Sequence, residues 1–125
     1  MIPFKLDMDR VPLDDWGTPE DIGAQSLGPA PRVAGKILFG TLDSPVSGGL
    51  YAATRGRYRV TYPFDEHATL LDGQLALTDE ASGATVVYGP GDSWIIAAGS
   101  TIVWDIRSEG VRKSYLAVSP GAKAA

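Results

Sequence analysis

Two glycine-rich stretches, Tyr62–Gly73 (YPFDEHATLLDG) and Gly89–Gly99 (GPGDSWIIAAG), decide the fold of this chain. Each combines a short run of apolar and β-branched residues with glycine, proline or aspartate. These last three residue types supply the backbone angles that tight turns need. Short strands joined by tight turns are typical of a small closed β-barrel.

The same alternation of short strands and turns continues on both sides of these stretches. From Gly35 onward, short strand-like runs alternate with turn residues, and no helical periodicity appears. The expected strands are Lys36–Leu42, Gly49–Thr54, Arg57–Tyr62, His67–Leu71, Gln74–Thr78, Ala84–Tyr88, Ser93–Ala97, Thr101–Arg107 and Val111–Val118. The separators include Arg55-Gly56, Asp72-Gly73 and Glu109-Gly110. This spacing predicts an all-β sandwich or barrel.

The first part of the chain is different, because five of the nine prolines lie within its first 31 residues. Proline removes a donor from a β-ladder, so residues 1–34 are predicted to form an irregular arm with short edge strands at most. Leu13–Trp16 is a candidate for one helical turn with an aspartate cap. The arm either crosses the barrel, reaches a partner subunit or packs loosely. We expect the barrel over residues 35–119 and a flexible tail over 120–125.

Composition excludes several classes of partner. A chain of 125 residues fits one domain, and it has no cysteine for a disulfide or a thiolate metal site. Its net charge of −4 argues against nucleic acid. No apolar run is long enough to span a bilayer, and the start lacks a signal-peptide pattern. These features predict a cytoplasmic protein without a membrane partner.

Alternation along two expected strands predicts which side chains point inward. In an extended strand, neighbouring residues face opposite sides. One apolar face is formed by Tyr58, Val60 and Tyr62, and a second by Ile102, Trp104 and Ile106. The opposite faces carry charges, namely Arg55, Arg57 and Arg59 in the first strand and Asp105 and Arg107 in the second. The three arginines fit a solvated face better than an anion site.

Residues from about Arg57 to Tyr115 resemble the cupin superfamily, a group of small RmlC-like jelly-roll barrels. The distinctive pieces are Glu66 placed ahead of Gly73, the Gly89–Asp92 turn, Trp104 and the stretch Val111–Tyr115. The chain looks most like the short single-domain subgroup related to ureidoglycine aminohydrolase and the ethanolamine-utilisation Q protein. The resemblance implies a jelly-roll fold and a homodimer.

The resemblance also implies a metal site whose ligands are mostly missing here. Cupins generally use two histidines and a glutamate from one motif and a histidine from the next. Those positions fall on Val60, Tyr62, Glu66 and Ile102, so three of the four expected ligands are absent. Strand parity turns His67 outward if Glu66 points inward. We expect no firmly held metal and no cofactor, and a weakly bound divalent ion stays an open alternative because a bulge would change the parity.

The candidate chemistry centres on Glu66. A carboxylate in an apolar pocket needs a partner and is suited to hold or move a proton. Tyr62 would donate a hydrogen bond, and Lys113 would be the counter-ion or a second catalytic group if it faces inward, or a solvated lysine if it does not. The predicted catalytic residues are therefore Glu66, Tyr62 and Lys113. The predicted substrate pocket is lined by Tyr58, Val60, Ile102, Trp104, Ile106 and Tyr115.

Three functions fit these observations. The first is a cupin enzyme that acts on a nitrogen-containing metabolite, a ureido or amino compound, with Glu66 as acid or base. The second is a metal-free barrel that binds a small molecule without transforming it, and the third is a structural or accessory dimer. Asp92 is expected to serve its turn, and Trp16 and Trp94 are expected to fill the core or an interface.

Overall fold

The computed structural model describes residues 1–120, so residues 121–125 of the predicted tail lie outside the described residues. The described chain is almost entirely β-structure. Its elements are β1 (Asp14–Gly17), η1 (Pro19–Ile22), β2 (Gln25–Ser26), β3 (Val33–Phe39), β4 (Val46–Thr61), β5 (Asp65–Asp72), β6 (Leu75–Asp79), β7 (Thr85–Tyr88), β8 (Ser93–Ile96) and β9 (Thr101–Val118).

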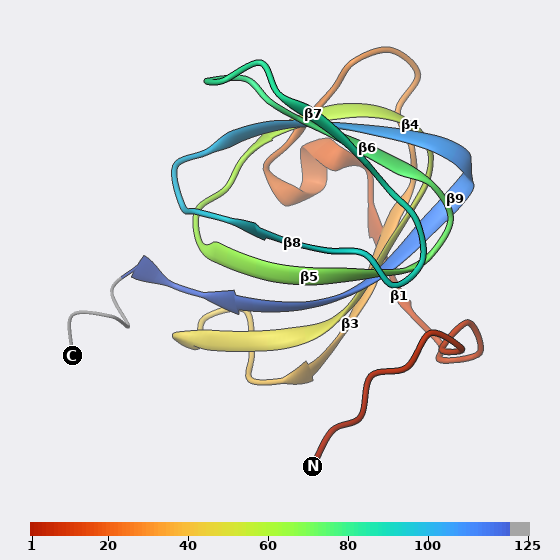
Figure 1. Cartoon of the computed structure of the whole chain (residues 1–125). Coiled ribbons are helices and arrows are strands. Elements are labelled where there is room, and N and C mark those ends of the chain that lie inside the picture. Colours follow the sequence, from red (N-terminus) through yellow and green to blue (C-terminus); the bar gives the residue numbers. More distant parts are fainter. Residues whose placement is uncertain (121–125) are drawn as a thin grey trace.

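Two long strands, β4 and β9, organise the barrel. They pair antiparallel along nearly their whole length, from Val46 opposite Val118 to Thr61 opposite Thr101. The first half of β9 also pairs with β6, and its second half pairs with β5. The other strands extend the sheet in the order β1-β3-β4-β9-β5-β8, with β7 on β6. The sheet therefore wraps around a central core, which gives the predicted jelly-roll barrel (Figure 1).

Two predicted turns were wrong, because β4 and β9 run through them. Arg55-Gly56 lies inside β4 at a register shift between Thr54 and Gly56, which is a bulge and not a turn. Gly56 has φ of 153°, and a Cβ there would lie 3.2 Å from Pro31. Glu109-Gly110 lies inside β9 opposite this bulge. Glycine at these positions bends the paired strands and carries the sheet around the barrel.

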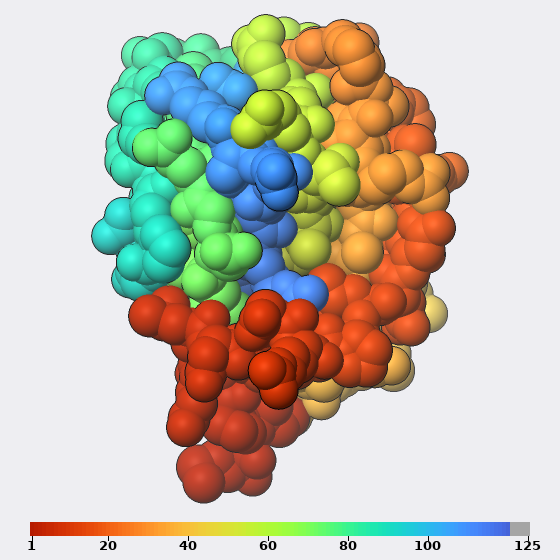
Figure 2. Space-filling view, turned by 90° about the vertical axis from the view of Figure 1, so that its right-hand side faces the viewer, coloured from red at the N-terminus to blue at the C-terminus, as the bar shows by residue number. Residues whose placement is uncertain are grey.

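The N-terminal arm lies against the barrel of its own chain. β1 pairs with β3, and β2 pairs with β4. The helical turn expected over Leu13–Trp16 was wrong, because these residues enter β1 and the 3-10 turn η1 follows at Pro19. The Arg112 guanidinium donates to the backbone oxygens of Met8 at 2.6 Å and Val11 at 3.1 Å. The start of the arm is thus fixed to β9, and its first residues, in red, lie at the bottom of the molecule in Figure 2.

The core lies between the inward faces of these strands and is rich in aromatic rings. Trp104 is 1% exposed, and its ring stacks on Tyr58 with centroids 5.3 Å apart. Trp94 meets Trp104 edge-on at 6.2 Å. The described part of the chain contains no helix with the length and apolar character needed to cross a membrane.

Candidate functional site

A buried ion pair lies inside the barrel. The Lys113 ammonium donates to both oxygens of the Glu66 carboxylate, at 3.0 Å to Oε1 and 2.9 Å to Oε2. Glu66 is 3% exposed and Lys113 is 5% exposed. Charged side chains are rarely this buried unless they are paired. The surrounding residues must therefore stabilise both charges.

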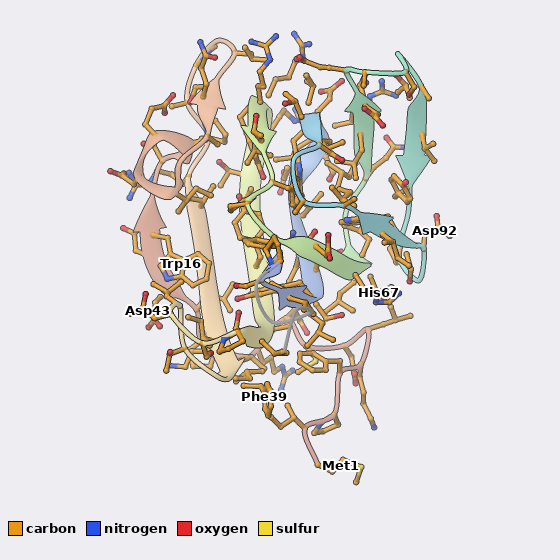
Figure 3. The ribbon with its side chains drawn as sticks, turned by 90° about the vertical axis from the view of Figure 1, so that its left-hand side faces the viewer. Met1, Trp16, Phe39, Asp43, His67 and Asp92 are labelled. Carbon is orange, nitrogen blue, oxygen red and sulfur yellow. The ribbon has the colours of Figure 1, made fainter. Side chains whose placement is uncertain are left out.

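Strand parity brings the pair together as the sequence predicted. In β5, Glu66 and Ala68 point inward and His67 between them is exposed. Figure 3 shows His67 on the outer side of the barrel wall. On β9, Lys113 faces inward and Arg112 faces outward toward the arm. The strands align Glu66 with Ala117, four residues beyond Lys113, so the two side chains reach toward each other inside the barrel to form the pair.

The carboxylate accepts further hydrogen bonds from two aromatic side chains. Trp94 Nε1 donates to Glu66 Oε1 at 3.2 Å, and the Tyr62 hydroxyl donates to the same oxygen at 3.4 Å. The Tyr62 hydroxyl in turn accepts from Trp104 Nε1 at 3.2 Å. Oε1 is therefore approached by three donors, whereas Oε2 accepts from Lys113. Among residues 1–120 the structure gives Oε2 no further donor, so one of its lone pairs can accept from a ligand.

Aromatic rings surround the ammonium group. Lys113 Nζ lies 4.7 Å from the ring centroid of Trp104 and 4.9 Å from that of Tyr51. The rings of Tyr115 and Trp94 follow at 5.7 and 5.9 Å. These ring faces attract a cation, but they also keep water away. Desolvation lowers the pKa of Lys113 below its ordinary value, and the charge of Glu66 opposes that shift.

Two buried tyrosine hydroxyls form a second polar contact. The hydroxyls of Tyr51 and Tyr58 lie 2.8 Å apart. Burial raises the pKa of both phenols and of Tyr62 above the ordinary value, so all three stay protonated at neutral pH. When two hydroxyls form one hydrogen bond, one of them donates its proton to the other. The second hydroxyl keeps its own proton, which can be donated to another acceptor.

A cavity of about 450 Å³ connects these groups to the surface. This volume lies within the usual range for small-molecule sites, which are mostly apolar with a few fixed polar groups. The mouth is formed by the N-terminal arm, the β3–β4 loop and the β4–β5 loop. The residues around the cavity are Trp16, Asp21, Ile22, Leu42, Ser44, Ser47, Tyr51, Tyr58, Val60, Tyr62, Pro63, Phe64, Glu66, Trp104, Lys113, Tyr115, Ala117 and Ser119.

A larger hollow of about 790 Å³ lies outside the barrel, beside the N-terminal arm. Two of its cations are already engaged, because Arg32 pairs with Asp15 at 2.8 Å and Arg112 binds backbone oxygens of the arm. It is also more open than the interior cavity. The interior cavity is therefore the better candidate site, since fixed polar groups converge inside it.

The structure brings most of the predicted site residues together. Tyr62 and Lys113 both donate to Glu66, and Tyr58, Val60, Trp104 and Tyr115 line the same cavity. Ile102 and Ile106 are buried in the core cluster and do not border the cavity.

Two residues of the site, Tyr51 and Trp94, were not predicted from the sequence as site residues. Tyr51 lies opposite Lys113 in the β4–β9 register, and that register could not be read before the pairing of the strands was known. Trp94 was expected as a filler and is buried, yet its indole nitrogen also donates to Glu66. Asp92 accepts from Gly89 N at 2.8 Å, which confirms its role in the turn.

The metal site of the superfamily does not fit these residues. At the four ligand positions, Val60 and Ile102 carry no donor atom, and Tyr62 is a protonated phenol. Within residues 1–120, no group of three or more histidine, cysteine, aspartate or glutamate side chains could hold an ion. The Lys113 ammonium also lies against Glu66, where it would repel a divalent cation. The donor set therefore contradicts a metal centre at this place.

Comparisons with known proteins agree with this fold. Residues 41–115 match the family model described as the EutQ-like cupin domain. No protein of curated function matches the sequence significantly.

Solved structures of two EutQ proteins are similar to this chain. The ethanolamine utilization protein Q of Salmonella typhimurium is 27% identical, with a TM-score of 0.60 over 70% of this chain and 69% of the other. The EutQ protein of Clostridium difficile is 25% identical, with a TM-score of 0.62 over 74% and 71%. A Pseudomonas syringae protein of unknown function is 22% identical, with a TM-score of 0.71 over 87% of this chain and 45% of its own.

Proposed function

The chain belongs to the EutQ-like cupin domain family, and from that premise we propose that its barrel binds a small nitrogen-containing metabolite, a ureido or amino compound. Glu66 exchanges a proton with the ligand, Tyr62 supports the carboxylate through its hydroxyl, and Lys113 holds the opposite charge. The similar Salmonella typhimurium protein is named for ethanolamine utilization, and ethanolamine is an amino compound, which supports this ligand class.

One observation carries this proposal: a buried, ion-paired carboxylate borders a cavity of about 450 Å³ and keeps a free lone pair on Oε2. An N–H group of an amine or a ureide is the kind of donor that this oxygen accepts. The hydroxyl proton left over in the Tyr51–Tyr58 pair serves an acceptor on the same ligand. Trp104 supplies a flat apolar wall.

We propose that this site works without a divalent metal. In metal-dependent enzymes the ion supplies a fixed positive charge near the substrate. Here the Lys113 ammonium supplies one, held by Glu66 and by the rings around it.

The second candidate is a cupin that binds a ligand or assists another protein without catalysis. The complete hydrogen bonding of Glu66 Oε1 favours it, because a purely structural pair would need the same three donors. The two functions share the cavity and differ in turnover.

Thermal unfolding with a panel of amines, ureides and small acids tests ligand binding. A ligand at one hundred times its dissociation constant stabilises the native state by about 2.7 kcal/mol, which a melting curve detects. The double variant Glu66→Gln/Lys113→Met should lose this response because it removes both charges. The matched control Glu80→Gln, on the outer surface, should keep it. No stabilisation by any compound of the panel would contradict the proposal.

Turnover separates the two candidate functions. The compounds that stabilise the protein should be consumed by the wild type and by Glu80→Gln, and not by Glu66→Gln. Binding without consumption would favour the accessory role. We also propose that the protein acts in the cytoplasm as a homodimer, and light scattering of the purified protein tests the dimer.

A further inference from the structure

We infer that Lys113 is a nucleophile that captures a small aldehyde or ketone as an imine inside the barrel. The inference rests on the proposed ligand-binding role of the cavity, and it assigns to the cavity a second class of ligand, one with a reactive carbonyl group. Three features of the structure support it: the placement of the amine, the acid beside it and the exclusion of water.

The amine is placed where a cavity ligand can reach it. Lys113 is one of the residues that line the cavity, so a ligand bound there lies beside this side chain. The other lysines described are in a different setting, since Lys5 is exposed and the Lys36 side chain is 43% exposed. Desolvation of an amine favours its neutral form, which is the reactive one. Desolvation acts on Lys113 in that direction.

Because Glu66 lies beside Lys113, the amine can become neutral without changing the net charge of the buried pair. Lys113 Nζ lies within 3.0 Å of both carboxylate oxygens of Glu66. Transfer of one proton along this hydrogen bond gives a neutral amine and a carboxylic acid. A nucleophile in hydrogen-bond contact with its own acid–base group is the arrangement that covalent catalysis uses. The Tyr62 hydroxyl at 3.4 Å orients the carboxyl group.

The reaction balances without any added oxidant or reductant. The nitrogen lone pair forms a C–N bond to the carbonyl carbon, and the carbonyl oxygen takes a proton from Glu66. The resulting carbinolamine returns one N–H proton to Glu66. The C–O bond then breaks, and its oxygen leaves as water with a proton from Glu66. The products are one water, a protonated imine on Lys113 and the Glu66 carboxylate regenerated beside it.

The surrounding rings favour the product. The imine keeps the positive charge of the ammonium, so the faces of Trp104 and Tyr51 stabilise it as they stabilise the lysine. They also limit the water that would hydrolyse it. The cavity volume of about 450 Å³ leaves room for a small carbonyl compound.

Reductive trapping tests the inference. The full chain is incubated at neutral pH with propionaldehyde and sodium cyanoborohydride, and adducts are located by peptide mapping with mass spectrometry. We expect Lys113 to be modified at least about tenfold faster than Lys5 or Lys36, since a positioned acid–base group contributes about 10²- to 10⁴-fold. Equal or faster labelling of Lys5 and Lys36 would overturn the inference.

Two variants identify the reacting groups. Lys113→Arg keeps the positive charge but has no amine that forms an imine, so the fast adduct should vanish. Glu66→Gln should slow labelling of Lys113 by at least about tenfold. If circular dichroism shows that Glu66→Gln is unfolded, the labelled sites of the wild type and of Lys113→Arg still test the inference. A fast adduct that persists in Lys113→Arg would overturn the assignment.

The result is separate from the test of the proposed function. If panel ligands stabilise the protein but Lys113 is not labelled preferentially, the imine inference fails and ligand binding stands. If Lys113 is labelled preferentially and no nitrogen compound stabilises the protein, the inference stands and the nitrogen-containing ligand fails.

Discussion

The barrel interior has an apolar part and a polar part, and the two are stabilised in different ways. The apolar core, represented by Leu70, Leu75 and Ile106, contains side chains that are at most 2% exposed. The polar core, formed by Tyr51, Tyr58, Tyr62, Glu66 and Lys113, is almost as buried, yet each of these side chains makes a hydrogen bond to another buried side chain. The apolar core depends on packing alone, and the polar core depends on every partner being present.

The difference between the two parts bears on the proposed function. Apolar side chains of similar volume would fill the same space without a desolvation penalty, and such replacements are often neutral or stabilising. Retention of the charged pair, at the wall of a cavity, therefore needs another reason than stability. The proposed ligand binding would supply such a reason, since the pair borders the cavity.

The largest expected effect comes from breaking the ion pair on one side. Glu66→Gln or Lys113→Met alone leaves a buried charge without its counter-charge, so each should lower the free energy of unfolding by about 3–5 kcal/mol. The double variant should recover most of that loss. Urea unfolding measures all three. If the single losses simply add in the double variant, the two residues are not energetically coupled and the distinction between the two cores fails.

A substitution in the apolar core should cost nearly as much, without any rescue. Ile106→Ala leaves a void in a closely packed region, which predicts a loss of about 2–5 kcal/mol. Val60→Ala is the matched control, because Val60 is half-buried and already borders the cavity, so its loss should be smaller. Urea unfolding of both variants provides the comparison. A larger loss for Val60→Ala would mean that the cavity wall, and not the apolar core, stabilises the barrel.

High pH should destabilise the polar core specifically. The folded pKa values of Tyr51, Tyr58 and Tyr62 lie above the ordinary 10.0, so the unfolded chain releases their protons first. As the pH rises above 10.0, the free energy of unfolding should fall by about 1.36 kcal/mol per pH unit for each phenol that is still protonated in the folded state. The lowered pKa of Lys113 acts in the opposite direction, but only below its ordinary 10.5.

Ultraviolet absorbance of tyrosinate checks this pH effect. Deprotonation of the buried phenols should coincide with loss of the native circular dichroism signal. Tyr51→Phe should weaken the pH dependence. A titration of all five tyrosines near pH 10 in the folded protein would contradict it.

Local patterns predicted the wall of the barrel but not its bends. Alternation in β5 was enough to turn Glu66 inward and His67 outward, because parity depends only on neighbouring residues. The bends at Gly56 and Gly110 were mistaken for turns, because glycine serves a turn and a bulge equally well in a sequence. The pairing partner decides between them.

The contacts of the site required the register between distant strands. Lys113 could be placed on a face with Tyr115, but which face looked inward depended on how β9 pairs with β4 and β5. The same register places Tyr51 opposite Lys113. The positions of Ile102 and Ile106 show the converse, since an inward direction does not say whether a side chain meets a cavity or a neighbour.

The smallest expected effect is on the outer wall, where an ion pair joins Arg59 and Glu80. Their side chains are 42% and 36% exposed, so water already solvates both charges. Glu80→Gln should lower the free energy of unfolding by less than about 1 kcal/mol, and added salt should reduce even that difference. Urea unfolding at low and high salt measures it. The chemical change is the same as in Glu66→Gln, whereas the burial and the partners of the carboxylate differ. A loss as large as that of Glu66→Gln would show that removal of a glutamate charge, and not its burial, dominates, and the contrast between interior and surface would no longer hold.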